Sequence, residues 1–141
     1  MKKEITLPGL NIQYPISQEI RLGNKTVETR FYPIPKKYLN IPMWLIETPG
    51  SVGNFSARAI AVVIFDSCFE YTSEAAFYKD SNRHLVDRKS DWKWDKKKNK
   101  WGWTISKIYP LKQSIPVSKR RGIVYTNSIK LQTSEQFLFL E

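Results

Sequence analysis

Residues 14–30 change their periodicity at a single glycine, and this change restricts the folds that are open to the chain. Ile16 and Ile20 are four residues apart, so they share one face of a helix. Pro15 suits a first helical turn, and Gly23 suits the position just past a helix end, where φ is often positive. The sequence therefore predicts a short helix that ends in a tight corner.

Beyond this glycine the residues alternate in the manner of a strand. Val27 and Thr29 fall on one face, which we expect to meet the core, while Glu28 and Arg30 project together from the other. Lys25 stands at the corner, where strand alternation has not yet begun. We therefore predict that the charged groups of Lys25, Glu28 and Arg30 converge on one concave cleft.

The pattern Gly-x-Lys-x-x-Glu-x-Arg, formed by Gly23, Lys25, Glu28 and Arg30, resembles the motif of the ASCH family, a branch of the PUA-like β-barrels. The resemblance extends over roughly residues 10–126. It implies an α+β fold that is mainly β, namely a PUA-like mixed β-barrel with two or three short helices. It also implies a role linked to nucleic acid, with RNA as the expected partner.

Further elements follow from local patterns. Residues 2–13 are expected to form a strand or an extended arm, and residues 43–48 and 57–66 form apolar, strand-like runs. A short helix is predicted to begin near Ser73, a capping residue followed by an acid. The prolines of residues 110–117 predict a loop or an irregular edge.

Residues 88–103 contain two Trp-x-Trp pairs on either side of a lysine-rich turn, which predicts a β-hairpin. Exposed tryptophans offer stacking surfaces, and base–aromatic stacking contributes roughly 1–3 kcal/mol per base. For any single tryptophan, packing in the core is the competing interpretation. We expect at least one of the four to face solvent: Trp92, Trp94, Trp101 and Trp103.

The positive charge is concentrated in one segment. The chain carries a formal net charge of +10, and residues 79–121 alone hold 14 of the 23 Lys and Arg residues but 4 of the 13 Asp and Glu residues. A field this localised favours a polyanion, and nucleic acid is the most common one. The competing interpretation is a solvated basic surface without a partner.

These observations define a candidate nucleic-acid-binding site. The cleft is expected to be walled by residues 33–37, with Glu28 held by Arg30, Lys25 or Arg58 and with Arg30 left to meet a phosphate. Without the resemblance, the motif would be interpreted as a surface ladder of ion pairs. The predicted contacts are Lys25, Glu28, Arg30, Arg58, Trp92, Trp94, Lys96, Lys97, Lys98, Lys100, Arg120 and Arg121.

An enzyme is the alternative. Some ASCH proteins are described as hydrolases that cut RNA or remove acetyl from N4-acetylcytidine, and the resemblance would make Lys25 and Glu28 the catalytic residues. In the deacetylating type a threonine occupies the position of Glu28, which counts against that chemistry, and Glu74 is the nearest acid for its distant glutamate. His84, the single histidine, is expected on the surface or at a cap, and it is a candidate acid or base for a ribonuclease.

Length and composition limit the number of domains, the compartment and the kinds of partner that we expect. A chain of 141 residues suits one domain, and we expect a monomer without metal or cofactor. The single cysteine, Cys68, predicts a buried thiol in a reducing, cytoplasmic compartment, and no apolar run is long enough to cross a membrane. The apolar residues 137–140 leave a third hypothesis, a protein-interaction module.

Overall fold

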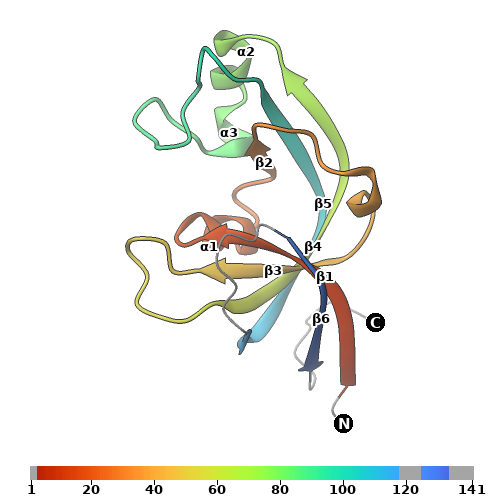
Figure 1. The fold of residues 1–141 in the computed structure, drawn as a ribbon. Coiled ribbons are helices and arrows are strands. Elements are labelled where there is room, and N and C mark those ends of the chain that lie inside the picture. Colours follow the sequence, from red (N-terminus) through yellow and green to blue (C-terminus); the bar gives the residue numbers. More distant parts are fainter. Residues whose placement is uncertain (1–2, 118–124, 134–141) are drawn as a thin grey trace.

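The computed structural model describes residues 3–117 and 125–133. A mixed six-stranded sheet organises this part of the chain, in the order β2-β5-β4-β3-β1-β6 (Figure 1). Strands β1 and β3 run parallel, and every other neighbouring pair is antiparallel. The strands are β1 (Lys3–Gln13), β2 (Val27–Arg30), β3 (Met43–Thr48), β4 (Arg58–Tyr71), β5 (Lys100–Pro116) and β6 (Tyr125–Thr133).

Short helices complete the described chain: α1 (Ile16–Arg21), α2 (Glu74–Lys79), α3 (Ser81–His84) and the 3-10 turn η1 (Lys36–Tyr38). The mainly β fold with short helices is thus confirmed. The closed barrel is not confirmed, because β2 and β6 form two edges of an open sheet in the residues described. Strands β4 and β5 extend past the other strands and carry β2, α2 and α3 at one end (Figure 1).

The corner at Gly23 forms as the sequence predicts. Helix α1 ends at Arg21, and Gly23 adopts a φ of +83°, a value that glycine reaches without steric cost. The Gly23 N–H donates to the carbonyl of Ile20, which closes the last turn. Ile20, 1% exposed, anchors the helix in the core, and Val27 begins β2 fully buried.

The predicted apolar strands and the second helix are confirmed as well. Strand β3 has the predicted bounds, whereas β4 continues past the predicted end to Tyr71. The Ser73 hydroxyl accepts a hydrogen bond from the Ala76 N–H, so Ser73 caps α2 as expected.

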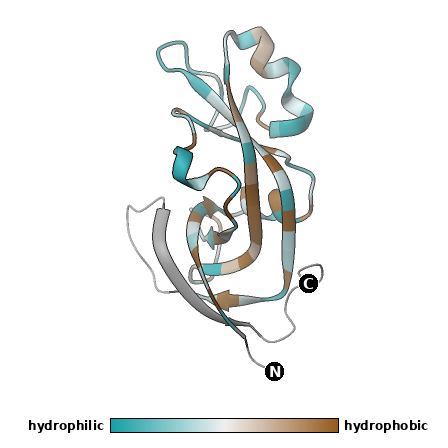
Figure 2. Ribbon diagram, turned by 90° about the vertical axis from the view of Figure 1, so that its right-hand side faces the viewer, coloured by the Kyte–Doolittle hydropathy of each residue, from teal (hydrophilic) through white to brown (hydrophobic). Residues whose placement is uncertain are grey.

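The core follows the long strands, and Figure 2 shows the hydrophobic residues gathered along them. The largest cluster joins α1 to β3, β4 and β5 through residues such as Ile20, Leu45, Phe65 and Trp103. A separate small cluster of Tyr71, Phe77 and Val86 holds α2 and α3 against the end of β4. Helices α2 and α3 are therefore fixed by this aromatic packing, whereas α1 is held by the main core.

The predicted hairpin within residues 88–103 is wrong. Residues 85–99, which we call the basic loop, contain turns and no strand. Side chains supply local hydrogen bonds there: Asp87 accepts from the Lys89 N–H, Ser90 from the Trp92 N–H and Asp95 from the Lys97 N–H. The basic loop cannot pair with the start of β5 as a strand, because β2 already pairs with one edge of β5 and β4 with the other.

Of the two alternatives predicted for residues 110–117, a loop and an irregular edge, the structure shows the irregular edge, because β5 continues to Pro116 with a shift in its pairing to β4. Pro110 lies opposite Ala61, next to a register shift in the β4–β5 ladder. Strand β2 pairs with β5 only as far as Thr104, so Pro110 lies where β2 no longer covers that edge of β5. Proline is tolerated at edges and bulges, since no ladder donor is needed there.

No helix in the described ranges has the length and apolarity needed to cross a membrane. The predicted contacts Arg120 and Arg121, and the apolar residues 137–140, lie outside the described residues.

Candidate functional site

The corner after α1 positions the first motif lysine. The backbone carbonyl of Glu19 accepts hydrogen bonds from the N–H groups of both Asn24 and Lys25, each 3.0 Å long. These bonds turn the chain at the helix end and direct it into β2. Lys25 is 4% exposed, and its ammonium group donates to the backbone carbonyl of His84.

The three charged motif residues meet at the carboxylate of Glu28. The Lys25 Nζ lies 3.7 Å from Glu28 Oε1, and an Arg30 guanidinium nitrogen lies 3.0 Å from Glu28 Oε2. The Thr29 N–H also donates to this carboxylate, at 3.1 Å. Arg30 donates in addition to the carbonyl of Asn11, so it is engaged by the protein rather than left for a phosphate as we expected.

Burial governs the electrostatics of this group. Glu28 is 6% exposed, and the side chain of Arg30 is 18% exposed. Loss of solvation lowers the pKa of Lys25, and the charge of Glu28 partly opposes this effect. An ion pair with so little contact with water differs from the surface ladder that the strand pattern alone would suggest.

Lys100 is a fourth charged member of the site, and no local pattern in the sequence indicates its position there. We expected it on an exposed hairpin, but it is 1% exposed. Its Nζ donates to the Trp92 carbonyl at 2.7 Å and lies 4.4 Å from the centre of the Phe31 ring. Desolvation lowers the pKa of Lys100 to about 8, against the opposing charge of Glu28.

His84 is buried, which overturns the expected surface position. Its ring stacks on Phe77 with 4.1 Å between centroids. The Val86 N–H donates to Nδ1, so Nε2 carries the hydrogen and donates to the Phe77 carbonyl at 2.7 Å. Burial lowers the pKa of His84, and both ring nitrogens are occupied, so this residue shapes the wall instead of moving protons.

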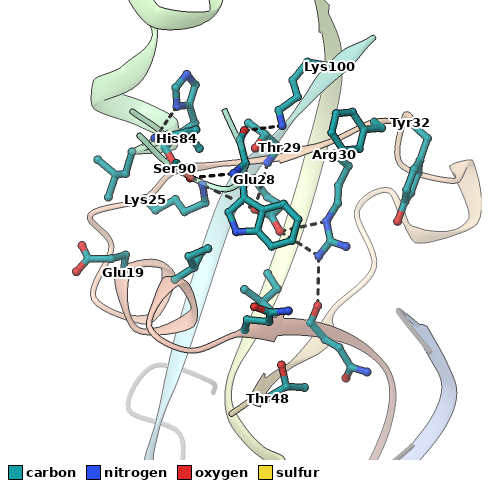
Figure 3. A pocket seen from close by; sticks show the side chains of 18 residues that line it. Glu19, Lys25, Glu28, Thr29, Arg30, Tyr32, Thr48, His84, Ser90 and Lys100 are labelled. Atoms are coloured by element: carbon teal, nitrogen blue, oxygen red, sulfur yellow. Dashed lines mark hydrogen bonds and ion pairs between the residues drawn. The ribbon is translucent and has the colours of Figure 1, made fainter. Parts of the chain in front are cut away.

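These residues surround a cavity of about 570 Å³, which we call the cleft (Figure 3). The loop of residues 33–37 does not line it, so the predicted wall is wrong. Thr29, expected in the core, is half-buried and lines the cleft instead. The lining residues come from β1, α1, β2, β3, the end of α3, the basic loop and β5: Asn11, Ile12, Gln13, Ile16, Glu19, Lys25, Glu28, Thr29, Arg30, Phe31, Tyr32, Thr48, His84, Leu85, Val86, Ser90, Trp92 and Lys100.

The rim of the cleft is unusually apolar for an exposed surface. Phe31 and Tyr32 are each 38% exposed, Trp92 is 41% exposed and Leu85 is 43% exposed, and all four line the cleft. Large exposed apolar side chains that gather at one cavity are a common mark of a binding site. Sequence reasoning identified Trp92 but missed Phe31 and Leu85.

The other predicted contacts are spread more widely. Lys96, Lys97 and Lys98 are exposed on the basic loop, and Lys98 lies 4.9 Å from the Phe31 ring centre. Trp94 is partly buried and packs against the small aromatic cluster beside α2. Neither Trp94 nor the lysines at 96–98 line the cleft.

Arg58 does not line the cleft, and its charge is paired elsewhere. It donates to Glu47, a carboxylate with no exposed surface, at 2.8 Å. Ser17 and Gln18 of α1 donate to the same carboxylate, at 2.7 and 2.6 Å. Arg58 therefore helps to hold α1 on the sheet, and it supports the cleft through that helix.

Neither a protein-family model nor a curated protein matches the sequence. Solved structures do match. A crystal structure of an ASCH protein from Zymomonas mobilis is similar with a TM-score of 0.66 and 13% identity, over 85% of this chain and 85% of that chain. Two single-residue variants of that protein give TM-scores of 0.65 and 0.63, at 13% and 12% identity, over 85% of this chain and 88% and 86% of theirs. The chain therefore has the fold of an ASCH domain, as the motif at Gly23, Lys25, Glu28 and Arg30 predicted.

Proposed function

We propose that this domain binds single-stranded RNA, with one nucleotide inside the cleft and the flanking phosphates on the basic loop. The observation that carries the proposal is the meeting of three cations, Lys25, Arg30 and Lys100, with an exposed aromatic rim at one cavity. Positive charge that follows a backbone, combined with aromatic platforms for bases, is the arrangement that single-strand-binding proteins use.

The size and chemistry of the cleft fit a single nucleotide. A volume of about 570 Å³ lies within the range of roughly 300–1,000 Å³ that small-ligand pockets occupy. Phe31, Tyr32 and Trp92 supply ring faces at its mouth, while Glu28 and Arg30 supply an acceptor and donors within it. A base in the cleft would thus meet both stacking and hydrogen-bonding groups.

The basic loop supplies charge outside the cleft. Lys96, Lys97 and Lys98 are exposed and follow one another, and the Phe31 ring lies between Lys98 and Lys100, 4.9 and 4.4 Å from their amines. When lysines neutralise phosphates, counterions are released. For a single strand, the logarithm of the binding constant then falls by about 0.7 per phosphate contact for each tenfold increase in salt concentration.

A salt titration tests the proposal. Binding of a fluorescent single-stranded RNA is measured by anisotropy at several salt concentrations, for the wild type and for a variant with Lys96, Lys97 and Lys98 changed to Ser. We expect the logarithmic salt slope of the variant to flatten by about 2. The control changes the exposed lysines of other surfaces, Lys36, Lys107 and Lys112, to Ser, with the same loss of charge. Equal slopes for the two variants would remove the basic loop from the interface.

A small hydrolase is the second candidate, because a lysine with a lowered pKa beside a carboxylate suits proton transfer. Two observations weigh against it. Glu74 does not line the cleft and pairs with Arg88 at 3.0 Å, so it does not supply the distant glutamate of a deacetylase. Both nitrogens of His84 are bound to backbone groups, so it does not supply the acid or base of a ribonuclease.

The enzyme candidate is tested directly with RNA and with N4-acetylcytidine. Wild type, Lys25→Ala and Glu28→Gln are incubated with each substrate across pH and with added divalent cations. Turnover by the wild type that is lost in both variants would establish a hydrolase. We expect no turnover of either substrate by any of the three proteins.

A further inference from the structure

Lys100 stands in a different chemical setting from the other lysines of the site. It lines the cleft, and its amine is held by the Trp92 carbonyl and by the Phe31 ring. Among the described residues no carboxylate forms an ion pair with it, whereas Lys25 lies 3.7 Å from Glu28. A buried ammonium without a carboxylate partner loses its hydration and gains little in return.

This setting raises the share of the neutral amine, which is the nucleophilic form of lysine. Burial is the main cause of the lowered pKa of Lys100, about 8. The charged groups that act on it are Glu28 of β2 and Asp95 of the basic loop, which favour the ammonium, and Lys25, which disfavours it. At pH 7.5 the neutral fraction of Lys100 is thus roughly 200-fold that of an ordinary exposed lysine.

Two rings lie near the amine: Phe31 at the rim, and Phe77 of the small aromatic cluster on the buried side, 5.7 Å from Nζ. Phe31, whose ring centre lies 4.4 Å from Nζ, is 38% exposed. A ligand that displaces this ring reaches the amine without breaking the packing of the sheet. Lys25 and Arg30 share the single carboxylate of Glu28 on the lining of the same cleft, so this group keeps a net positive charge that favours a phosphate on such a ligand (Figure 3).

We propose that the Lys100 amine condenses with an aldehyde that carries a phosphate, bound in the cleft below Phe31. The nitrogen attacks the carbonyl carbon and forms a C–N bond. The carbonyl oxygen then leaves as water with the two amine protons, and a C=N bond remains. The step is reversible and involves no change of oxidation state.

Two sources offer this chemistry. One is a free, phosphorylated aldehyde. The other is the ring-opened sugar of an RNA position that has lost its base, which presents an aldehyde between phosphates. The second source rests on the proposed function, whereas the first does not depend on RNA binding.

The test traps the imine with borohydride and locates it by peptide mass mapping. The free aldehyde is probed with pyridoxal 5′-phosphate, and the strand with a single-stranded RNA that contains one abasic position. At pH 7.5 we expect Lys100 to be labelled by the first probe about tenfold more than Lys96, Lys97 or Lys98, and to be cross-linked by the second. An RNA of the same length with every base intact is the matched control, and Lys100→Arg should lose both products.

The outcomes separate the sources. Labelling of Lys100 by pyridoxal phosphate alone supports the free aldehyde, and cross-linking by the abasic strand supports the RNA source. Label found on the exposed lysines or on Lys25, with Lys100 unmodified by either probe, overturns the inference, and this result needs no variant protein. If intact RNA fails to bind while pyridoxal phosphate still labels Lys100, the proposed function fails and the reactive lysine stands.

Discussion

The cleft and the basic loop carry the same kind of charge in opposite surroundings. Lys25 and Lys100 are 4% and 1% exposed, and each is held by a backbone carbonyl. Lys96, Lys97 and Lys98 are exposed to solvent. Burial of the two cleft lysines costs solvation free energy, fixes the direction of their amines and lowers their pKa values. The exposed lysines are weakly held, and salt screens their charge. In the proposed function, the buried charge serves selectivity and chemistry, whereas the exposed charge serves attraction.

The largest effect we expect is on stability, from removal of the carboxylate at the centre of the cleft. Glu28→Ala leaves Lys25 and Arg30 buried without their shared partner, and breaking such a pair costs about 3 kcal/mol of unfolding free energy. Denaturant unfolding measures it. The control, Glu74→Ala, removes an ion pair whose side chains are 44% and 67% exposed, and it should cost under about 1 kcal/mol. Similar costs for the two variants would erase the distinction between cleft and surface.

A smaller effect is expected on RNA affinity from the aromatic rim. Trp92→Ala removes a side chain that is 41% exposed, so stability should change little. Loss of one stacked base weakens binding by roughly 1–3 kcal/mol, which is about fivefold at the lower end, and it leaves the salt slope unchanged. Leu22→Ala, at a 61% exposed apolar position outside the cleft, is the control. An equal loss of RNA affinity in both variants would show that the aromatic rim makes no specific contribution to RNA binding.

The smallest effect is the pH dependence of stability. The pKa of Lys100 falls from an ordinary 10.5 to about 8 in the folded protein, so the unfolded state binds more protons between these values. Unfolding free energy should therefore rise with pH, by about 1 kcal/mol between pH 8 and about 9.5. Lys25, whose pKa is also lowered, acts in the same direction. The rise should shrink in Lys100→Met and persist in Lys96→Met, and thermal or denaturant unfolding at each pH checks this.

Local signals along the sequence predicted much of the fold. The α1–Gly23–β2 corner, strand β3 and the Ser73 cap each depend on a few neighbouring residues, and each formed as expected. The motif also identified the fold of the family, because its four residues build that corner.

The failures share one cause, which is that the surroundings of a residue come from distant parts of the chain. Nothing next to Lys100 in the sequence reveals that Phe31 and Phe77 enclose it. The hairpin failed because β2 and β4 occupy both edges of the strand that begins at Lys100. His84 lies in a charged segment, but its ring packs against Phe77, seven residues earlier and across a helix boundary.

The most direct test of the account follows the tryptophan indole N–H signals by NMR while RNA is added. Trp92 lies at the rim of the cleft, whereas Trp44 has no exposed surface, does not line the cleft and serves as the internal reference. If RNA binds at the rim of the cleft, the Trp92 signal shifts in proportion to the bound RNA while the Trp44 signal stays in place. RNA that binds without moving the Trp92 signal would contradict the proposal that the cleft holds a nucleotide.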